Sequence, residues 1–206
     1  MIHAGTKANA NRFTGDWIFV DIGFAEKASS CGLLVGDGTP EVISFSRLCS
    51  RVLEIVGTGS NPLNLLIEAP LSVAFNEDGN PTGRRIERRG SQTRYWYVGL
   101  GCSVLVAATY LLRAINKDVG EREVRLFEGF ASFKEKNSRS SHRKDVLDLR
   151  RVVWEGDSEL GSTVSADALV VCSTHQLCSA FLVAGMNFGI PPVVVLGNPA
   201  GLQSAD

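Results

Sequence analysis

Trp17-Ile18-Phe19-Val20-Asp21-Ile22-Gly23 is an apolar run that closes on an acidic residue and a glycine, and the fold prediction starts from it. Runs this short and this rich in β-branched and aromatic residues are typical of buried strands. A second run covers residues 31–36 and a third covers residues 41–45. Between them stands Asp37-Gly38, a strong signal for a tight hairpin. We therefore expect a three-strand antiparallel meander near the N-terminus.

Strand and helix patterns alternate through the rest of the chain. Ser46 can cap a helix whose apolar stripe is Leu48, Val52, Leu53 and Val56. Further strands are expected over residues 63–68, 124–127 and 192–196, and further helices over residues 98–116, 145–154 and 165–182. The polar segments 76–91 and 134–144 are predicted to be loops. The predicted fold class is α/β with a mixed sheet, built as one domain over residues 14–206 after a flexible N-terminal segment of residues 1–13.

Composition excludes several classes of protein. The 206 residues carry a formal net charge of −1, so bulk charge predicts no polyanionic partner. The N-terminus lacks the apolar stretch of a signal peptide. Residues 97–112 and 168–197 are too short or too interrupted for a membrane span, so we expect core segments and no membrane association. The five cysteines form no CxxC pair, which favours reduced thiols in a cytoplasmic protein.

Four acidic residues stand at the ends of apolar runs. They are Asp21, Glu68, Glu128 and Asp167. Ligand sites tend to lie at the carboxyl edge of such sheets. Converging carboxylates repel one another unless a cation holds them, so this pattern predicts a Mg²⁺ or Mn²⁺ site.

Each of these carboxylates also has a purely structural explanation. Strand-end acids commonly cap turns or face water, and Asp167 would be favoured by the dipole at the start of a helix. Asp145 and Asp148 are alternative ligands, although their DxxD spacing also suits the solvated face of a helix.

Two segments concentrate basic residues. The first, residues 83–97, contains one glutamate and the five arginines Arg84, Arg85, Arg88, Arg89 and Arg94. The second, residues 134–151, includes Lys136, Arg139, His142, Arg143 and Lys144. Arginine forks suit phosphate, and Tyr95-Trp96-Tyr97 could stack on bases. A nucleic-acid groove between the two segments is one explanation; a solvated turn followed by core aromatics is the other.

These motifs together resemble the RNase H-like superfamily. Asp21-Ile22-Gly23 with the hairpin that follows is similar to its first strands, and Ile67-Glu68-Ala69-Pro70 is similar to the strand-end carboxylate of RuvC-type resolvases. The nearest resemblance is to DUF429-type predicted nucleases. Glu128, Asp167-Ala168 and the arginine loop also match motifs of that group. The family commonly has Asp where Glu68 stands, and a Pro near the position of Gly129-Phe130.

The resemblance implies two-metal hydrolysis of phosphodiesters in DNA or RNA. It assigns Asp21, Glu68, Glu128 and Asp167 as catalytic metal ligands and the basic residues as the nucleic-acid surface, with a homodimer as one possible assembly. Two alternatives stay open. One is a non-catalytic RNase H-fold protein that binds nucleic acid or a partner; the other is an actin-like ATPase relative.

Overall fold

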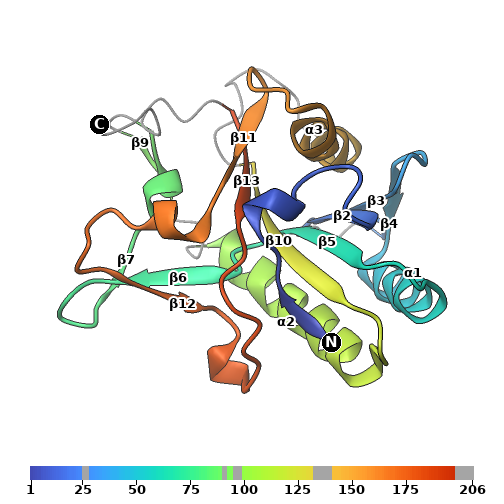
Figure 1. Cartoon of the computed structure of the whole chain (residues 1–206), viewed down its shortest axis with the longest axis horizontal. Helices are drawn as coiled ribbons and strands as arrows, with labels where there is room; N and C mark the ends of the chain where they lie inside the picture. The colour runs from blue at the N-terminus through green and yellow to red at the C-terminus, as the bar shows by residue number, and fades with distance from the viewer. Residues whose placement is uncertain (25–27, 90–91, 95–98, 132–140, 198–206) are drawn as a thin grey trace.

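The computed structural model describes residues 1–24, 28–89, 92–94, 99–131 and 141–197. Eight described strands form one mixed sheet (Figure 1). They are β1 (Ile2–Ala4), β2 (Asp16–Ile22), β3 (Cys31–Val35), β4 (Glu41–Ile43), β5 (Leu63–Glu68), β10 (Val124–Phe130), β11 (Gly161–Val164) and β13 (Val193–Leu196). The strand order is β11-β13-β10-β5-β2-β3-β4, with β1 also paired to β10.

The sheet has an antiparallel part and a parallel part. Strands β2, β3 and β4 form the predicted antiparallel meander, and Gly38 N–H closes the turn between β3 and β4 on the Val35 carbonyl at 2.9 Å. Strand β5 runs parallel to β2, β10 parallel to β5, and β13 parallel to β10. The prediction of an α/β fold with a mixed sheet is confirmed.

Three helices in the described part of the chain cover the two faces of this sheet. Helices α1 (Phe45–Thr58) and α2 (Leu100–Asp118) lie below it in Figure 1, and α3 (His142–Glu155) lies above it. Alternation along β2 divides the core between these layers. Ile18 and Val20 pack with α1 and α2, whereas Trp17 and Phe19 pack with α3. Helix α1 begins earlier than predicted, because Ser44 is its cap: the hydroxyl accepts the Arg47 N–H at 3.3 Å.

Residues 1–13, predicted to be a flexible segment, contain a short strand of the main sheet. Strand β1 pairs with the first half of β10, opposite Val124–Leu126, whereas β13 pairs with the second half of the same strand, opposite Glu128–Phe130. Ile2 is buried by this pairing. A short 3-10 helix, η1 (Lys7–Asn9), follows with Thr6 as its cap. A three-residue strand has too little periodicity to be recognised, because its partner lies about 120 residues further along the chain.

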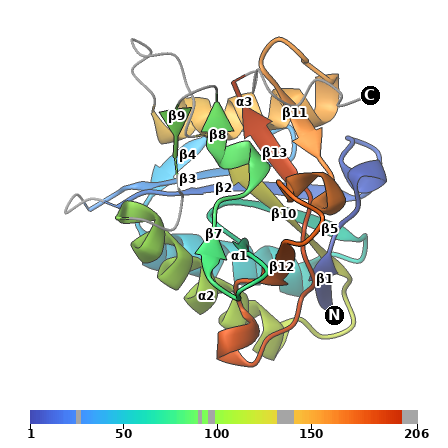
Figure 2. The ribbon, with the colours of Figure 1, turned by 90° about the vertical axis from the view of Figure 1, so that its left-hand side faces the viewer.

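The predicted helix over residues 165–182 is wrong. This segment contains the 3-10 helix η3 (Ala166–Leu169) and strand β12 (Gln176–Ser179), and η4 (Leu182–Ala184) follows. Strand β12 pairs with β6 (Ser72–Phe75), which also pairs with β7 (Pro81–Thr82); Figure 2 shows β7 and β12 in front of the main sheet. A short apolar run suits a helix or a strand equally, and the long-range pairing with β6 selects the strand.

The polar segment 76–91 contains structure as well as loop. After β7 come the 3-10 helix η2 (Arg85–Glu87) and a two-strand ribbon of β8 (Arg88–Arg89) and β9 (Gln92–Thr93). No helix in the described residues combines the length and the apolar character needed to cross a bilayer. All five cysteines are free thiols.

Candidate metal centre

Asp21 and Glu68 are paired residues on neighbouring parallel strands. Asp21 lies near the end of β2, Glu68 is the last residue of β5, and the two are directly in register. Paired residues of adjacent strands project to the same face of a sheet. That face is the one covered by α3, because Phe19 and Leu66, two residues earlier on each strand, pack in the α3 core. Both carboxylates therefore lie beneath the start of α3.

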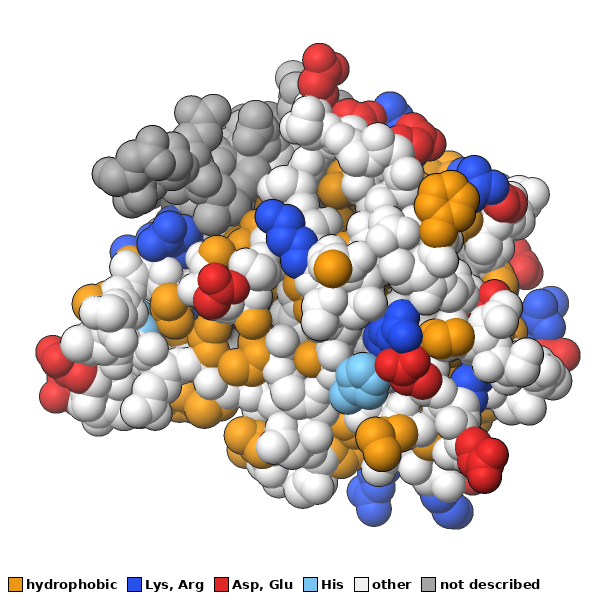
Figure 3. All heavy atoms as spheres, in the orientation of Figure 1, with side chains coloured by type: hydrophobic (Ala, Val, Ile, Leu, Met, Phe, Trp, Pro, Cys, Tyr) orange, Lys and Arg blue, Asp and Glu red, His pale blue; other side chains and the backbone are white. Residues whose placement is uncertain are grey.

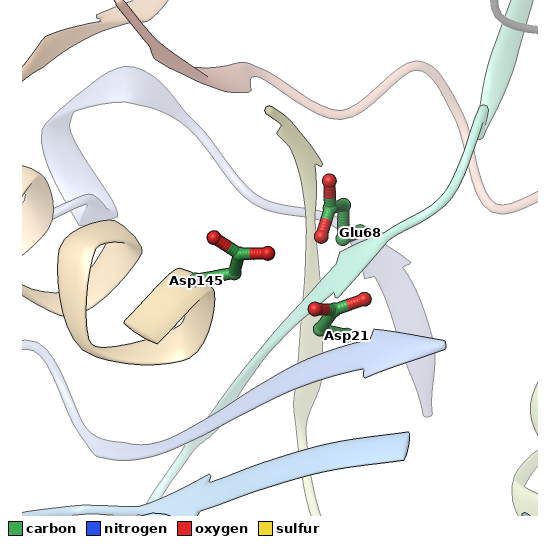
Figure 4. A group of neighbouring side chains, drawn as sticks. All are labelled: Asp21, Glu68 and Asp145. Atoms are coloured by element: carbon green, nitrogen blue, oxygen red, sulfur yellow. The ribbon is translucent and has the colours of Figure 1, made fainter. Parts of the chain in front are cut away.

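Asp145 is the third carboxylate of this group. It lies in the first turn of α3, where Ser141 caps the helix by accepting the Lys144 N–H at 3.3 Å. One oxygen from each of Asp21, Glu68 and Asp145 lies within 4.8 Å of the other two (Figure 4). Asp21 and Asp145 are each only 5% exposed, and Glu68 is partly buried. We call these three residues the acidic centre.

Two glycines allow α3 to begin so close to the sheet. Gly32 lies opposite Asp21 on β3, and a Cβ at Gly32 would stand 2.6 Å from the backbone oxygen of His142. A Cβ at Gly23 would stand 2.5 Å from Nε2 of the His142 ring and 1.9 Å from the Ser30 carbonyl. A side chain at either position would displace the first turn of α3, and Asp145 with it. The glycine of Asp21-Ile22-Gly23 thus supplies space for the acidic centre.

His142 contacts the acidic centre directly. Its Nδ1 lies 2.7 Å from Oδ2 of Asp21, and its ring is partly exposed. The sequence identified His142 only as a member of a basic segment, since nothing local indicates that the first residue of α3 reaches β2. This contact orients the Asp21 carboxylate. Such outer contacts commonly fix the geometry of a metal ligand.

Glu128 does not join the acidic centre. It pairs with Ile67, the residue before Glu68, so its side chain projects to the opposite face of the sheet, toward the core of α1 and α2. There its two oxygens accept hydrogen bonds from Nη1 and Nη2 of Arg84 at 2.9 and 2.8 Å, and Oε2 also accepts the Leu71 N–H at 2.9 Å. The predicted role of Glu128 as a metal ligand is therefore wrong. Gly129 occupies the position on β10 that faces the acidic centre, and a Cβ there would stand 3.4 Å from Cα of Glu68.

Arg84 is fully buried and belongs to the same polar network. Besides Glu128, it donates to Oε1 of Glu87 at 3.0 Å and to the Ser72 hydroxyl at 2.8 Å. Burial alone would lower the pKa of Arg84, but the charges and hydrogen bonds of Glu128 and Glu87 raise it above its ordinary value. Burial raises the pKa of Glu87, and the nearby Glu128 adds to that rise. The predicted contact of Arg84 with nucleic acid is wrong, because this cation ties the segment after β5 to β10.

Asp167 lies outside the acidic centre. It is exposed on η3, and a hydrogen bond with the Ser165 side chain lowers the pKa of its carboxyl group. The sequence prediction placed it at the start of a long helix, and the helix that supplies the third carboxylate is α3 instead. Of the two alternatives weighed from the sequence, Asp145 joins the centre and Asp148 forms an ion pair with Lys144.

The other predicted nucleic-acid residues are distributed unevenly. Arg88, Arg94 and Arg143 are exposed, and Arg85 is partly buried. Lys136, Arg139 and the side chain of Arg89 lie outside the described residues. On the face drawn in Figure 3, cationic and anionic side chains are interspersed and form no basic band. Two basic residues, Arg143 and Lys144, directly precede Asp145 in the first turn of α3.

The donor set of the acidic centre suits a hard divalent cation. All three donors are carboxylate oxygens, the ligands that Mg²⁺, Ca²⁺ and Mn²⁺ prefer over softer nitrogen or sulfur. Their convergence from β2, β5 and α3 could hold such an ion. Comparisons with known proteins give no further guide: no family model, curated protein or solved structure significantly matches this chain.

Proposed function

We propose that the acidic centre binds Mg²⁺ or Mn²⁺ and that the protein is a metal-dependent nuclease of RNase H-like type. The observation that carries this proposal is the convergence of Asp21, Glu68 and Asp145 within 4.8 Å. Three carboxylates at this distance repel one another strongly in a partly buried site. His142 can offset at most one negative charge. A bound divalent cation would offset this repulsion.

The topology supports the same family of folds that the sequence resembles. An antiparallel meander followed by parallel strands and helices is the order expected of an RNase H-like domain. Asp21 and Glu68 stand at the ends of the first and fourth strands of that expected order, β2 and β5. Asp145 then takes the place that the resemblance gave to Asp167, on the helix that covers these strand ends.

The acidic centre and two neighbouring residues of α3 would have different tasks in hydrolysis. Asp21, Glu68 and Asp145 would hold the cation, which in such sites activates water and neutralises the leaving oxygen of a phosphodiester. His142 keeps the Asp21 carboxylate in place through its 2.7 Å contact. Arg143 is exposed in the first turn of α3, where the positive end of the helix dipole also favours an anion. A substrate phosphate is therefore expected beside the start of α3.

The test is a cleavage assay on labelled single-stranded, duplex, hybrid and junction substrates in Mg²⁺, Mn²⁺ or EDTA. Asp21→Asn and Asp145→Asn should each abolish cleavage, because each removes one of three ligand charges. Asp167→Asn is the matched control: it makes the same chemical change at an exposed residue outside the centre and should retain wild-type cleavage. Unchanged metal-dependent cleavage by Asp21→Asn would refute the proposal.

One observation favours a non-catalytic function instead. The sequence predicted that Glu128 is a metal ligand and that Arg84 contacts phosphate, but the two side chains form a buried ion pair with each other. A three-carboxylate centre can bind a cation without supporting turnover. That alternative predicts salt-sensitive nucleic-acid binding with no cleavage of any substrate in either metal.

A further inference from the structure

A hollow of about 210 Å³ opens at the end of β2, on the side of the sheet covered by α1 and α2. Polar and apolar surface contribute about equally to its walls, and the apolar side chains include Ile22, Phe24, Phe45 and Val104. Ser30 and Ser103 add hydroxyl groups to this lining. Phe24 is 64% exposed, although most phenylalanines of the described chain are buried. The hollow thus combines an accessible aromatic ring with a few polar atoms.

The hollow and the acidic centre flank the same few residues of backbone. Asp21 faces α3, whereas Ile22 faces α1 and α2 and lines the hollow. Gly23 also lines the hollow. The His142 ring, which contacts Asp21, lies where a Cβ of residue 23 would point. The hollow and the acidic centre therefore lie on opposite sides of the last residues of β2.

The chemistry of the hollow suits a planar aromatic group with polar edges. Its volume lies below the roughly 300–1,000 Å³ of sites for drug-sized ligands, which favours a single ring system. Aromatic side chains bind bases of single strands by stacking on either face of the ring. Serine hydroxyls can donate to or accept from the edge of a base.

We propose that this hollow receives a nucleobase of the strand whose phosphate lies at the acidic centre. This inference rests on the proposed function and narrows its substrate. A base can enter the hollow only when it is unstacked from its partner strand, so the preferred substrate is single-stranded or locally opened nucleic acid and not intact duplex. Phe24 is then the stacking residue that selects this substrate.

The experiment measures binding by fluorescence anisotropy in Ca²⁺. The probes are a labelled single-stranded oligonucleotide and an abasic oligonucleotide of the same length and charge. The wild type should bind the base-containing strand about five- to tenfold more tightly, the lower end of the stacking contribution of one base. Phe24→Ala should remove this ratio while leaving abasic binding unchanged. Phe13→Ala, which removes a 91% exposed phenylalanine before the other end of β2, should keep it.

The outcomes separate this inference from the nuclease proposal. Equal affinity of the wild type for the two probes, or a ratio unchanged in Phe24→Ala, overturns the base subsite even if cleavage depends on Asp21. Loss of the ratio in Phe24→Ala supports the subsite even if no substrate is cut, and the nuclease proposal then fails alone. Absence of binding to both probes overturns the subsite.

Discussion

Glu68 and Glu128 lie near the ends of the neighbouring parallel strands β5 and β10, yet their side chains lie on opposite faces of the sheet. The cause is register: Glu128 is paired with Ile67, one residue before Glu68. Because side chains alternate along a strand, this single step moves Glu128 from the face of α3 to the face of α1 and α2. Two acids that look equivalent in sequence therefore have different roles. Glu68 joins Asp21 and Asp145, and Glu128 binds Arg84.

Divalent cations should stabilise the wild-type protein against unfolding. A cation that binds only the folded state adds about 2.7 kcal/mol at a hundred times its dissociation constant. Mn²⁺ should therefore raise the melting temperature relative to EDTA. Asp145→Asn should bind Mn²⁺ at least about tenfold more weakly, comparable to the loss on removing an outer-shell partner, and should therefore lose about half of that increase or more. Calorimetric titration with Mn²⁺ measures the affinity, and Asp167→Asn serves as the control. An equal Mn²⁺ response in Asp145→Asn and the wild type would contradict the assigned ligand set.

Breaking the buried network should cost stability without removing metal binding. Glu128→Gln leaves the Arg84 guanidinium with less compensation in a fully buried site, where removal of one partner costs about 3–5 kcal/mol. Urea unfolding should show this loss. At urea concentrations where the variant stays folded, its Mn²⁺ affinity should match that of the wild type.

The double variant Arg84→Met with Glu128→Gln checks the cause. It removes both charges of the buried pair, the Arg84 guanidinium and the Glu128 carboxylate, and leaves neither charge without its partner. It should therefore cost less stability than the sum of the two single variants. Strict additivity would show that Arg84 and Glu128 are not coupled. Loss of Mn²⁺ binding in Glu128→Gln with little loss of stability would return Glu128 to the metal site.

Stability should depend on pH through Glu87. Its folded pKa is raised above the ordinary value of 4.5, mainly by burial, so the folded state holds a proton that the unfolded state releases first. The resulting stabilisation is complete below pH 4.5 and is lost as the pH rises through the folded pKa. The free energy of unfolding of the wild type should therefore fall relative to Glu87→Gln as the pH rises above 4.5. Urea unfolding of both proteins across this range measures the difference. A constant difference, or one that grows with pH, would show that the ionised carboxylate is the form favoured by the fold.

Gly23→Ala should disturb both stability and the acidic centre. The new Cβ would stand 1.9 Å from the Ser30 carbonyl and 2.5 Å from Nε2 of His142, so backbone or ring must move. Overpacking of this kind costs about 1–3 kcal/mol. We expect weaker Mn²⁺ binding as well, because His142 orients Asp21.

Gly57→Ala is the matched control for that substitution. Gly57 lies in α1, and nothing stands within 4 Å of a Cβ there. Alanine is the better helix former, so this variant should be neutral or more stable by up to about 1 kcal/mol, with Mn²⁺ affinity unchanged. Equal effects of the two substitutions would show that the contact between Gly23 and His142 has no role.

Local sequence patterns were sufficient for most of the elements and for two members of the acidic centre. Strands β2 and β5 are short apolar runs bounded by polar and turn residues, so their ends, and with them Asp21 and Glu68, are visible without a structure. The meander follows from the Asp37-Gly38 turn, and α2 and α3 from helical patterns of apolar residues. All of these signals act between residues close together in the chain.

Only the tertiary structure decided which other carboxylate completes the centre. Asp145 reaches Asp21 because Gly32 and Gly23 let the start of α3 approach the sheet, a contact between segments more than 100 residues apart. Glu128 is excluded by the pairing register of β10 with β5, which no pattern within β10 encodes. Asp167 lies exposed on the short η3, in a segment where a long helix was expected. Local propensity selects the elements, whereas pairing and packing between distant segments determine which face, and which neighbours, each side chain meets.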